Sequence, residues 1–544
     1  MCLNQNLNPK GGAHLREFLD RKPIFNYIFL AVGAFLTALT LMIPSIGAVE
    51  WVSLVPAAIV FIITARDTEV HYKQMYLYGF VYYMSFGLSI FHWFINLYPL
   101  DFAGMTKPAA AVVVIVAWVG LSLLQAVFAA FMPVLLALLM RKSIISKYRI
   151  LTPFIAAALF TVFEWLQTLT WMGVPWGRLA IGQTEMPLML KSSSAFGSYF
   201  ITFLIVAVNF FLALFILMKK DEKRNVCLAA GAGLVALNLL VGMSAELLEA
   251  NDGEKIKAAA IQPNISSHEK WGWDSLTITK ETVRKYSLAA AEEGATLIVM
   301  PETVFPYNPL KNSSIYDFIT ELAVECDATL VVGGFTSGEE LDGNSLIFVH
   351  PDGSVDEKVY SKRHLVPFGE YVPMRKIIMT LIPPLAEISM LGEDLAPGKD
   401  SAVADTEAGR LGGLVCFDSI YEMLTVDSVR DGAEIIVLGT NDSWFLDSAA
   451  VYMHNAQAKL RATETGRYIV RAANTGISSI IDPDGRVLDE EPPLVEGYVT
   501  ADVAARDSLT LYSVIGNAFV YLNIAFSSIL LLSIFKDKII PKRN

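Results

Sequence analysis

Long apolar runs fill the first 247 residues of the chain and return near its end. A helix needs about 20 consecutive apolar residues to cross a bilayer, and about eight runs approach that length. We therefore predict a polytopic α-helical membrane domain over residues 1–247, with about seven spans, and a last span with a tail over residues 509–544. The predicted spans cover roughly 24–43, 50–65, 75–98, 111–140, 151–171, 196–218, 226–247 and 511–535.

Residues 248–508 have a different pattern, in which short β-like runs alternate with amphipathic helical stretches. This alternation is typical of an α/β domain. Asp352-Gly353 and Asp484-Gly485 are turn sequences that predict hairpin-like strand pairs. Strands are predicted over 257–262, 296–300, 329–333, 345–349, 411–416, 434–438 and 468–472, and helices over 276–293, 314–324 and 449–465.

The composition agrees with a membrane protein. Hydrophobic residues make up 54% of the chain and charged residues 18%, and the mean hydropathy is +0.46. The formal net charge of −12 argues against a nucleic-acid partner. The four cysteines form no CxxC pair and no His/Cys cluster, so we predict neither a metal site nor a disulfide framework. A bridge between Cys326 and Cys416 stays open.

Basic residues predict the orientation, because they concentrate in cytoplasmic loops. They lie in the N-terminal segment, in every second predicted loop and in the C-terminal tail, whereas the intervening loops contain few basic residues. Both termini are therefore expected in the cytoplasm, and residues 248–508 outside it. The basic residues concerned are Lys10, Arg16, Arg21, Lys22, Arg66, Lys73, Arg141, Lys142, Lys147, Arg149, Lys219, Lys220, Lys223, Arg224, Lys536, Lys538, Lys542 and Arg543.

Three reactive side chains stand beside strand-like runs of the α/β segment: Glu302, Lys362 and Cys416. A cysteine thiolate is a good nucleophile, but a free thiol, with a pKa of about 8.5, supplies little of it at neutral pH. A carboxylate can accept the thiol proton during attack, and an ammonium group can stabilise the resulting oxyanion. The three residues therefore predict a cysteine-dependent acyl-transfer site, although Glu302 and Lys362 taken singly are more often surface charges.

The ends of the predicted strands carry polar groups. Glu302 follows one strand, Cys416 ends another, and Asn441 with Asp442 follows a third. Active-site residues of α/β sheets gather at the carboxyl ends of strands. We therefore expect these side chains to converge on one cleft.

One predicted outward loop, residues 163–183, places Glu164 in or near an apolar span, with Trp165 and Trp176 close by. A carboxylate at that depth is costly unless it is paired or faces a cavity. Two interpretations are open: an aromatic belt at the interface with a snorkelled charge, or a lipid-side wall of the active site.

The order of Glu302, Lys362 and Cys416 resembles the nitrilase/carbon–nitrogen hydrolase superfamily. Over nearly its whole length the chain is similar to the membrane-embedded branch of that superfamily, the apolipoprotein N-acyltransferases. The motifs that carry the resemblance are Phe163-Glu164-Trp165, Gly173-Val174-Pro175-Trp176, Gln262-Pro263-Asn264-Ile265, Lys270-Trp271, Pro301-Glu302-Thr303, the stretch from Lys362 to Pro373, Asn441-Asp442-Ser443-Trp444-Phe445, His454, the stretch from Arg461 to Arg467, and that from Arg471 to Gly476.

The resemblance implies an αββα sandwich outside the cytoplasm and a reaction in two steps. Cys416 would be the nucleophile, Glu302 the general base and Lys362 the oxyanion stabiliser. Where the family has Cys-Tyr-Glu, this chain has Cys416-Phe417-Asp418, which puts substrate preference in doubt rather than the reaction class. The family pattern also implies supporting roles for Glu370, Phe417 and Asp418, and substrate contacts for Trp271, Asn441, Trp444, Trp165 and Trp176.

The implied substrates are a phospholipid acyl donor and a diacylated apolipoprotein acceptor. We expect a monomer in the cytoplasmic membrane of a bacterium, in contact with the lipid bilayer, with no cofactor and no metal. Two alternatives are weighed against this hypothesis. A membrane-tethered amidase of the nitrilase type would need one span rather than about eight, and a non-enzymatic membrane protein would not need an intact Glu302, Lys362 and Cys416.

Overall fold

The structure is a computed structural model that describes residues 12–100, 105–142, 148–218, 222–246, 253–266, 270, 272, 274–338, 341–381 and 394–539. The chain divides into two compact units. The first comprises Met1–His92, Ile115–Leu247 and Ile515–Asn544, and the second comprises Trp93–Val114 and Leu248–Val514.

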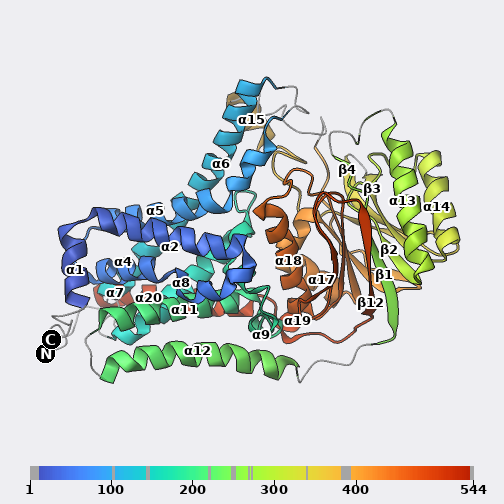
Figure 1. The fold of residues 1–544 in the computed structure, drawn as a ribbon. Coiled ribbons are helices and arrows are strands. Elements are labelled where there is room, and N and C mark those ends of the chain that lie inside the picture. The colour runs from blue at the N-terminus through green and yellow to red at the C-terminus, as the bar shows by residue number, and fades with distance from the viewer. Residues whose placement is uncertain are drawn as a thin grey trace. The chain divides into compact units, whose positions relative to one another are not determined.

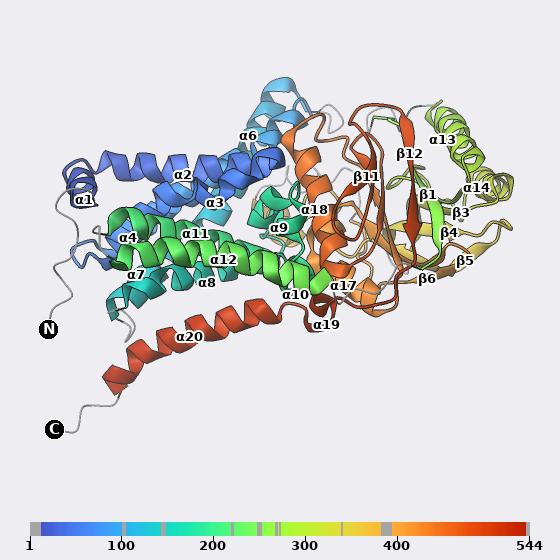
Figure 2. The same ribbon diagram turned by 60° about the horizontal axis from the view of Figure 1, so that its bottom comes forward.

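The first unit is helical (Figures 1 and 2). Among the described residues, six stretches are long and apolar enough to cross a membrane: Ile24–Met42, Pro44–Arg66, Lys107–Lys142, Arg149–Leu166, Ser198–Leu217 and Arg224–Ala245. The span predicted over 75–98 is helix α5 (Tyr72–Ile90), which is rich in tyrosine and starts with polar residues. The last predicted span lies in α20 (Ala518–Ile539), whose apolar part is Ala518–Ile534. The number of eight spans therefore stays a prediction.

Helix α11 (Ser198–Leu217) is the central helix of this unit and packs against α8 (Thr152–Leu166), α12 (Glu222–Glu246) and α4 (Val55–Arg66). Its Asn209 is fully buried, and its side chain satisfies backbone groups of a neighbouring segment where the helix is interrupted. The Asn209 side chain accepts a hydrogen bond from the Leu54 N–H at 3.0 Å and donates one to the Glu50 carbonyl at 2.9 Å. Irregular backbone is tolerated within an apolar layer only when such partners are present.

Glu164 is buried in the first unit, with 5% of its surface exposed. Its Oε2 accepts a hydrogen bond from the Leu179 N–H at 3.0 Å, and its Oε1 accepts one from the Thr202 hydroxyl at 2.8 Å. The interpretation of Glu164 as a snorkelled charge is therefore wrong. The side chain instead ties α8 to α11 and to the start of a 3₁₀ turn, Leu179–Gln183.

The second unit contains two six-stranded sheets. The first sheet has the order β12-β1-β2-β3-β4-β5, and the second has the order β11-β10-β9-β8-β7-β6. In both, a parallel centre (β1, β2 and β3; β7, β8 and β9) is extended by antiparallel strands at the edges. The strands are β1 (Lys255–Gln262), β2 (Ala295–Val299), β3 (Thr329–Ser337), β4 (Asp342–Val349), β5 (Val355–Ser361), β6 (Ala404–Thr406), β7 (Gly409–Val415), β8 (Ile435–Thr440), β9 (Ile469–Ala473), β10 (Ser478–Ile481), β11 (Val487–Glu491) and β12 (Gly497–Ala504).

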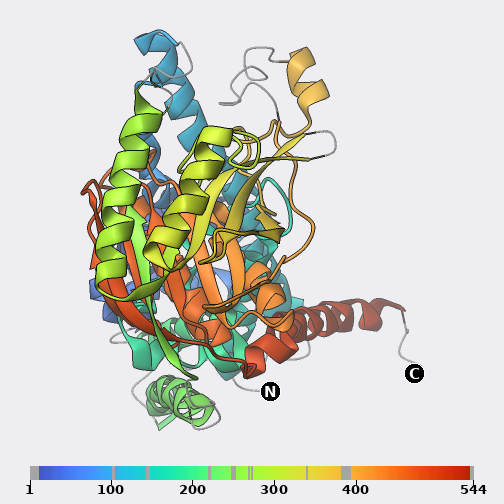
Figure 3. The ribbon, with the colours of Figure 1, turned by 90° about the vertical axis from the view of Figure 1, so that its right-hand side faces the viewer.

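Helices cover the outer faces of both sheets, which gives an αββα sandwich (Figures 1 and 3). Helices α13 (Ser275–Glu292) and α14 (Ser313–Cys326) lie on the first sheet, and α17 (Glu422–Arg430) and α18 (Ala449–Thr465) lie on the second. The predicted fold class is confirmed, with a helical unit of several apolar helices and an α/β unit built as an αββα sandwich.

Side chains that alternate along each strand of the first sheet contribute to two hydrophobic cores, one on each face of the sheet. In β1, Ala258 and Ala260 point into the layer between the sheets, whereas Ala259 and Ile261 point toward α13 and α14. Successive strand residues face opposite sides of a sheet, so a strand buried on both sides reads as a continuous apolar run. That pattern made the central strands predictable.

The predicted strands and helices of the α/β segment are all present, with shifted ends. Both hairpin turns are confirmed, because β4 pairs antiparallel with β5, and β10 pairs antiparallel with β11. The individual strands β5, β6 and β10 to β12 were not predicted. In β11, for example, exposed and half-exposed residues predominate, so its sequence lacks the run of apolar residues that marks a buried strand.

Candidate active site

The predicted reactive residues lie at or just after the ends of strands from both sheets. Cys416 follows β7 directly, Asn441 follows β8 directly, and Glu302 lies shortly after β2. Lys362 follows β5. The structure therefore brings Glu302 and Cys416 together, as the strand-end argument predicted, and it places Lys362 beside Glu302.

Cys416 occupies a sharp turn between β7 and the 3₁₀ helix η8 (Cys416–Ile420). Its φ angle is +48°, in a region that non-glycine residues rarely adopt. The side chain is half-buried, and both Cys416 and Cys326 are free thiols, so the bridge left open between them is absent. Burial raises the pKa of the Cys416 thiol well above its usual range, the Glu302 charge adds to this, and Lys362 opposes it. The resting thiol is therefore protonated and needs a base to attack.

Glu302 is held by three donors. Its Oε1 lies 3.0 Å from Nζ of Lys362 and 2.6 Å from Nδ2 of Asn344. Its Oε2 accepts a hydrogen bond from the Asn441 N–H at 2.8 Å. The side chain is only 6% exposed, so its orientation is fixed within the protein.

Lys362 is a buried cation between two carboxylates. Its Nζ lies 3.0 Å from Glu302 and 3.0 Å from Glu370, and 1% of its side chain is exposed. Burial by itself lowers the pKa of this lysine, but the charges of Glu302 and Glu370 outweigh it and raise the pKa well above the usual value. Lys362 therefore keeps its positive charge throughout the working pH range.

Sequence reasoning gave no role to Asn344, which connects the two carboxylates. Its Nδ2 donates to Glu302 Oε1 at 2.6 Å and to Glu370 Oε1 at 2.9 Å, and its carbonyl accepts the Lys362 N–H at 2.7 Å. Glu370 Oε2 in turn accepts the Val366 N–H at 2.8 Å. Asn344 lies in β4 just before a predicted apolar strand, so its position gave no sign of chemistry. Glu370, predicted as a supporting residue, lies in this network.

Lys270 lies under the loop that carries Glu302. Its Nζ donates a hydrogen bond of 2.8 Å to the Thr303 hydroxyl, and Thr303 has a φ angle of +43°. Burial lowers the pKa of Lys270 to about 8, although the Glu302 charge opposes the shift. The lysine thus stabilises a strained turn next to the carboxylate.

Asp418 is fully buried and organises the backbone on both sides of the site. Its Oδ1 accepts the His364 N–H at 2.8 Å, and its Oδ2 accepts the Tyr360 hydroxyl at 2.9 Å and the Val415 N–H at 3.2 Å. Burial raises the pKa of Asp418 to about 6, against the charge of Lys362 and these donors. The carboxylate therefore joins the segment around Lys362 to the Cys416 turn.

Phe417 contacts an aromatic stack rather than the charged residues. Its ring meets Tyr421 edge-on at 5.5 Å between centroids, and the His364 ring stacks on Tyr421 at 3.6 Å. Burial lowers the pKa of His364 to about 4, and the Arg363 charge adds to this. The imidazole is therefore neutral in this stack.

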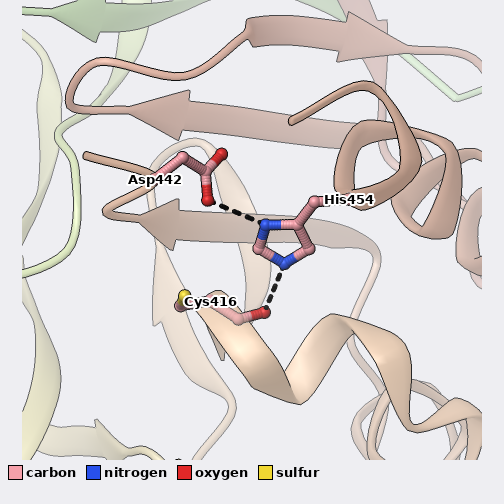
Figure 4. Close-up of side chains that lie close together, drawn as sticks. All are labelled: Cys416, Asp442 and His454. Atoms are coloured by element: carbon pink, nitrogen blue, oxygen red, sulfur yellow. Dashed lines mark hydrogen bonds and ion pairs between the residues drawn. The ribbon is translucent and has the colours of Figure 1, made fainter. Parts of the chain in front are cut away.

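A second polar cluster of Asp442, His454 and Arg471 lies behind the nucleophile. Figure 4 shows Asp442 and His454 beside Cys416. Asp442 Oδ1 lies 2.8 Å from His454 Nδ1, and its Oδ2 lies 2.6 Å from the Arg471 guanidinium. Donor atoms of Cys416, Asp442 and His454 lie within 4.8 Å of one another, a spacing that could accept a metal ion. However, hydrogen bonds already engage both ring nitrogens of His454, and a guanidinium faces the carboxylate. A cation would have to displace these contacts.

The predicted substrate contacts are distributed over both units. In the second unit, Asn441 directs its N–H to Glu302 and its Oδ1 to the Ser443 hydroxyl, and Trp444 is half-buried in the following loop. In the first unit, Trp165 meets Tyr521 edge-on at 5.9 Å, and Trp176 is 2% exposed, in the core of that unit. Trp271 lies outside the described residues.

The arrangement provides the groups needed for acyl transfer through a thioester. It combines a nucleophile on a sharp turn, a carboxylate that can accept its proton, and a permanent cation for the developing oxyanion. The carboxylates, the amide and the backbone donors that hold these groups come from both sheets of the sandwich.

Comparison with known proteins adds the family context. The carbon-nitrogen hydrolase family matches residues 257–508, and the apolipoprotein N-acyltransferase N-terminal domain family matches residues 33–211. An apolipoprotein N-acyltransferase of Geobacter metallireducens is 28% identical over 534 residues, which cover 95% of this chain and 97% of the relative. Another, of Bradyrhizobium diazoefficiens, is 30% identical over 66% of this chain and 69% of the relative.

Among solved structures, an amidase from Nesterenkonia sp. matches 51% of this chain and 98% of its own chain. The sequence identity is 19% and the TM-score is 0.38. No functional conclusion follows from a similarity at this level.

Proposed function

Because the chain belongs to the apolipoprotein N-acyltransferase family, we propose that Cys416 carries a fatty acyl chain from a phospholipid to an apolipoprotein. The protein is a membrane acyltransferase that acts in lipoprotein N-acylation. The acyl group is received by the α-amino group of an N-terminal diacylglyceryl-cysteine. The observation that carries the residue assignment is the buried contact of Lys362 with Glu302, next to a thiol on a strained turn.

The first step forms a thioester. Glu302 accepts the proton of the Cys416 thiol as the sulfur attacks an ester carbonyl of the phospholipid. Lys362 stabilises the tetrahedral oxyanion, because its ammonium stays charged between the two carboxylates. When the intermediate collapses, the C–O bond breaks, and the proton on Glu302 passes to the lysophospholipid oxygen. Cys416 is left acylated.

The second step transfers the acyl group. The neutral α-amine of the acceptor attacks the thioester carbonyl, an amide bond forms, and the C–S bond breaks. Glu302 accepts the proton that the nitrogen loses and returns it to the departing sulfur. The enzyme regains its starting state, as a ping-pong reaction requires.

The amidase alternative differs only in what resolves the thioester, which is water in a hydrolase. This chain matches the two apolipoprotein N-acyltransferases described above over most of their length. The acyltransferase reading therefore accounts for both units of the chain. A hydrolase would give no role to the helical unit beyond anchoring.

The proposal places the α/β unit outside the cytoplasm and both termini in the cytoplasm of a bacterial cell, with the enzyme as a monomer in the cytoplasmic membrane. The support is the distribution of Lys and Arg in the sequence. Labelling of intact spheroplasts with a membrane-impermeant thiol reagent tests the orientation. A cysteine replacing exposed Lys311 should be labelled, and one replacing Lys73 should be labelled only after lysis. The reverse pattern would overturn the orientation.

Intact mass spectrometry tests the function directly. The purified protein is incubated with phospholipid in detergent, and a synthetic diacylated lipopeptide is then added. We expect a fatty-acyl adduct on Cys416 that disappears when the lipopeptide becomes triacylated. Cys416→Ala should form no adduct, whereas Cys326→Ala, which changes a buried thiol outside the site, should behave as wild type. An adduct cleared by water alone would favour the amidase.

A further inference from the structure

His454, in helix α18, bonds the backbone of the nucleophile rather than its sulfur. Its Nε2 lies 3.2 Å from the carbonyl oxygen of Cys416, and its Nδ1 lies 2.8 Å from Asp442 Oδ1. Figure 4 shows the thiol pointing away from the imidazole ring. Cys416, His454 and Asp442 therefore have the composition of a Cys–His–Asp triad without its geometry.

The partners of the two ring nitrogens determine the protonation of His454. A carboxylate and a carbonyl can only accept hydrogen bonds, so each of the two nitrogens must donate. Nε2 also lies 3.1 Å from the Ser419 hydroxyl, but that hydroxyl donates its own hydrogen to the Cys416 carbonyl at 2.8 Å. Its oxygen therefore faces Nε2 as a second acceptor. In this geometry both ring nitrogens face acceptors, which is the set of partners that an imidazolium has.

The charges around the ring are consistent with a cation. Asp442 lies between His454 and Arg471, which lower its pKa to about 2 although burial opposes the shift, so the carboxylate stays ionised beside the ring. The Arg471 guanidinium is 3.4 Å from Nδ1 but only 2.6 Å from the carboxylate, which is its main partner. The charges of Glu302 and Lys362 act on Cys416 as well, and they shift its pKa in opposite directions.

Neighbouring segments hold the Asp442 carboxylate in one orientation. A side-chain carbon added at Gly476 would lie 2.3 Å from Asp442 Oδ2, closer than any real contact. The Thr440 hydroxyl donates to Asp442 Oδ1 at 3.0 Å. The orientation of Asp442, and through it that of the His454 ring, is thus fixed by three neighbouring segments.

We propose that His454 is a positioning residue for acyl transfer: an imidazolium, held by Asp442, that fixes the Cys416 carbonyl and with it the turn that presents the thiol. This inference rests on the proposed role of Cys416 as the nucleophile. Cys416 has a positive φ angle, so its turn is strained and needs an external contact to persist. The His454 hydrogen bond supplies that contact without taking the thiol proton, which goes to Glu302.

Two substitutions separate the contributions of the donor and the ring. His454→Gln retains an N–H that can reach the carbonyl, whereas His454→Leu removes it. Thioester formation in a single turnover should fall less than about tenfold in the glutamine variant and on the order of 10²-fold in the leucine variant. The KM for phospholipid should not change. His350→Gln, in a half-exposed surface contact, is the control and should match wild type.

The ring nitrogens are observed directly by ¹⁵N NMR of protein labelled at histidine, with the spectrum of His454→Gln subtracted. We expect both nitrogens of His454 to be protonated at neutral pH. A ring with one unprotonated nitrogen at neutral pH would overturn the proposal, as would a glutamine variant as inactive as Cys416→Ala, which would mark His454 as the base.

The rate of Cys416 alkylation by iodoacetamide, followed by peptide mass spectrometry, needs no lipid substrate. It should depend on pH differently in His454→Gln and in wild type, because the nearby cation is removed. An unchanged pH profile would contradict the imidazolium. Since neither this measurement nor the NMR spectrum requires turnover, a failure of the proposed function would be distinguished from a failure of this inference.

Discussion

The backbone N–H of Asn441 donates a 2.8 Å hydrogen bond to Oε2 of Glu302. Asn441 follows β8 in the second sheet, and Glu302 follows β2 in the first. The carboxylate that we assign as the base is therefore oriented by the opposite sheet. Gly439 permits this approach, because a side-chain carbon there would lie 3.1 Å from the backbone nitrogen of Glu302. The acyl-transfer site thus depends on the packing of the two sheets.

Replacing Lys362 by methionine should reduce thioester formation by about 10²–10³-fold, the usual effect of losing one oxyanion donor. The variant also leaves Glu302 and Glu370 buried without a cation, so the free energy of unfolding should fall by about 3–5 kcal/mol. Single-turnover mass spectrometry and thermal unfolding in detergent measure the two effects. Lys311→Met, at an exposed position, is the control. A rate within a few-fold of wild type would remove Lys362 from the mechanism.

Asn344→Ala should slow both steps of the reaction by roughly 10–100-fold, because hydrogen bonds to charged groups contribute about 1.5–3 kcal/mol. Asn344→Asp should be worse than alanine, since it would place a third carboxylate between Glu302 and Glu370. Pre-steady-state acylation and deacylation rates test this order. Asn308→Ala, which removes a polar contact with Ser337 away from the site, should have little effect. Equal rates for the alanine and aspartate variants would contradict the charge argument.

Activity should fall as the pH decreases through about 6, because burial raises the pKa of Asp418 to about 6 and its protonated form cannot accept all three hydrogen bonds. The effect on stability has the opposite sign. A native-state pKa raised above the unfolded value favours folding below the unfolded pKa, and that contribution is lost as the pH rises through about 6. Asp418→Glu should retain the acid limb of the rate profile, whereas Asp418→Asn should be slow at every pH. A profile unchanged in Asp418→Asn would show that another group titrates.

Glu164→Gln should lower the free energy of unfolding by about 1–3 kcal/mol. The NH₂ group of glutamine is itself a donor, and it would face one of the two groups whose hydrogen bonds the carboxylate now accepts. Thermal unfolding in detergent measures the loss. The exposed Glu185→Gln is the control. The rate of thioester formation per folded molecule should not change. A slower rate with an unchanged melting temperature would instead assign Glu164 a part in the reaction.

The central strands and the main helices could be predicted from the sequence because each leaves a local pattern. The three reactive residues were identified by their combined chemistry and by the family resemblance, because position alone does not single them out. The buried runs before Glu302 and Cys416 predicted strand ends, and strand ends predicted convergence. Asn344 left no such pattern, because an amide next to an apolar strand is common in any protein. Its role depends on carboxylates that lie 26 and 42 residues away along the chain.

By itself, the sequence determined where the apolar helices and the buried strands lie, since hydrophobic periodicity is a local property of the chain. It also determined the supply of a thiol, a carboxylate and an amine near strand ends. Only the tertiary structure decided the state of these groups. The charge on Lys362, the protonated thiol of Cys416 and the hydrogen bonds of His454 depend on burial and on neighbours that are distant in sequence and that packing alone brings within about 3 Å.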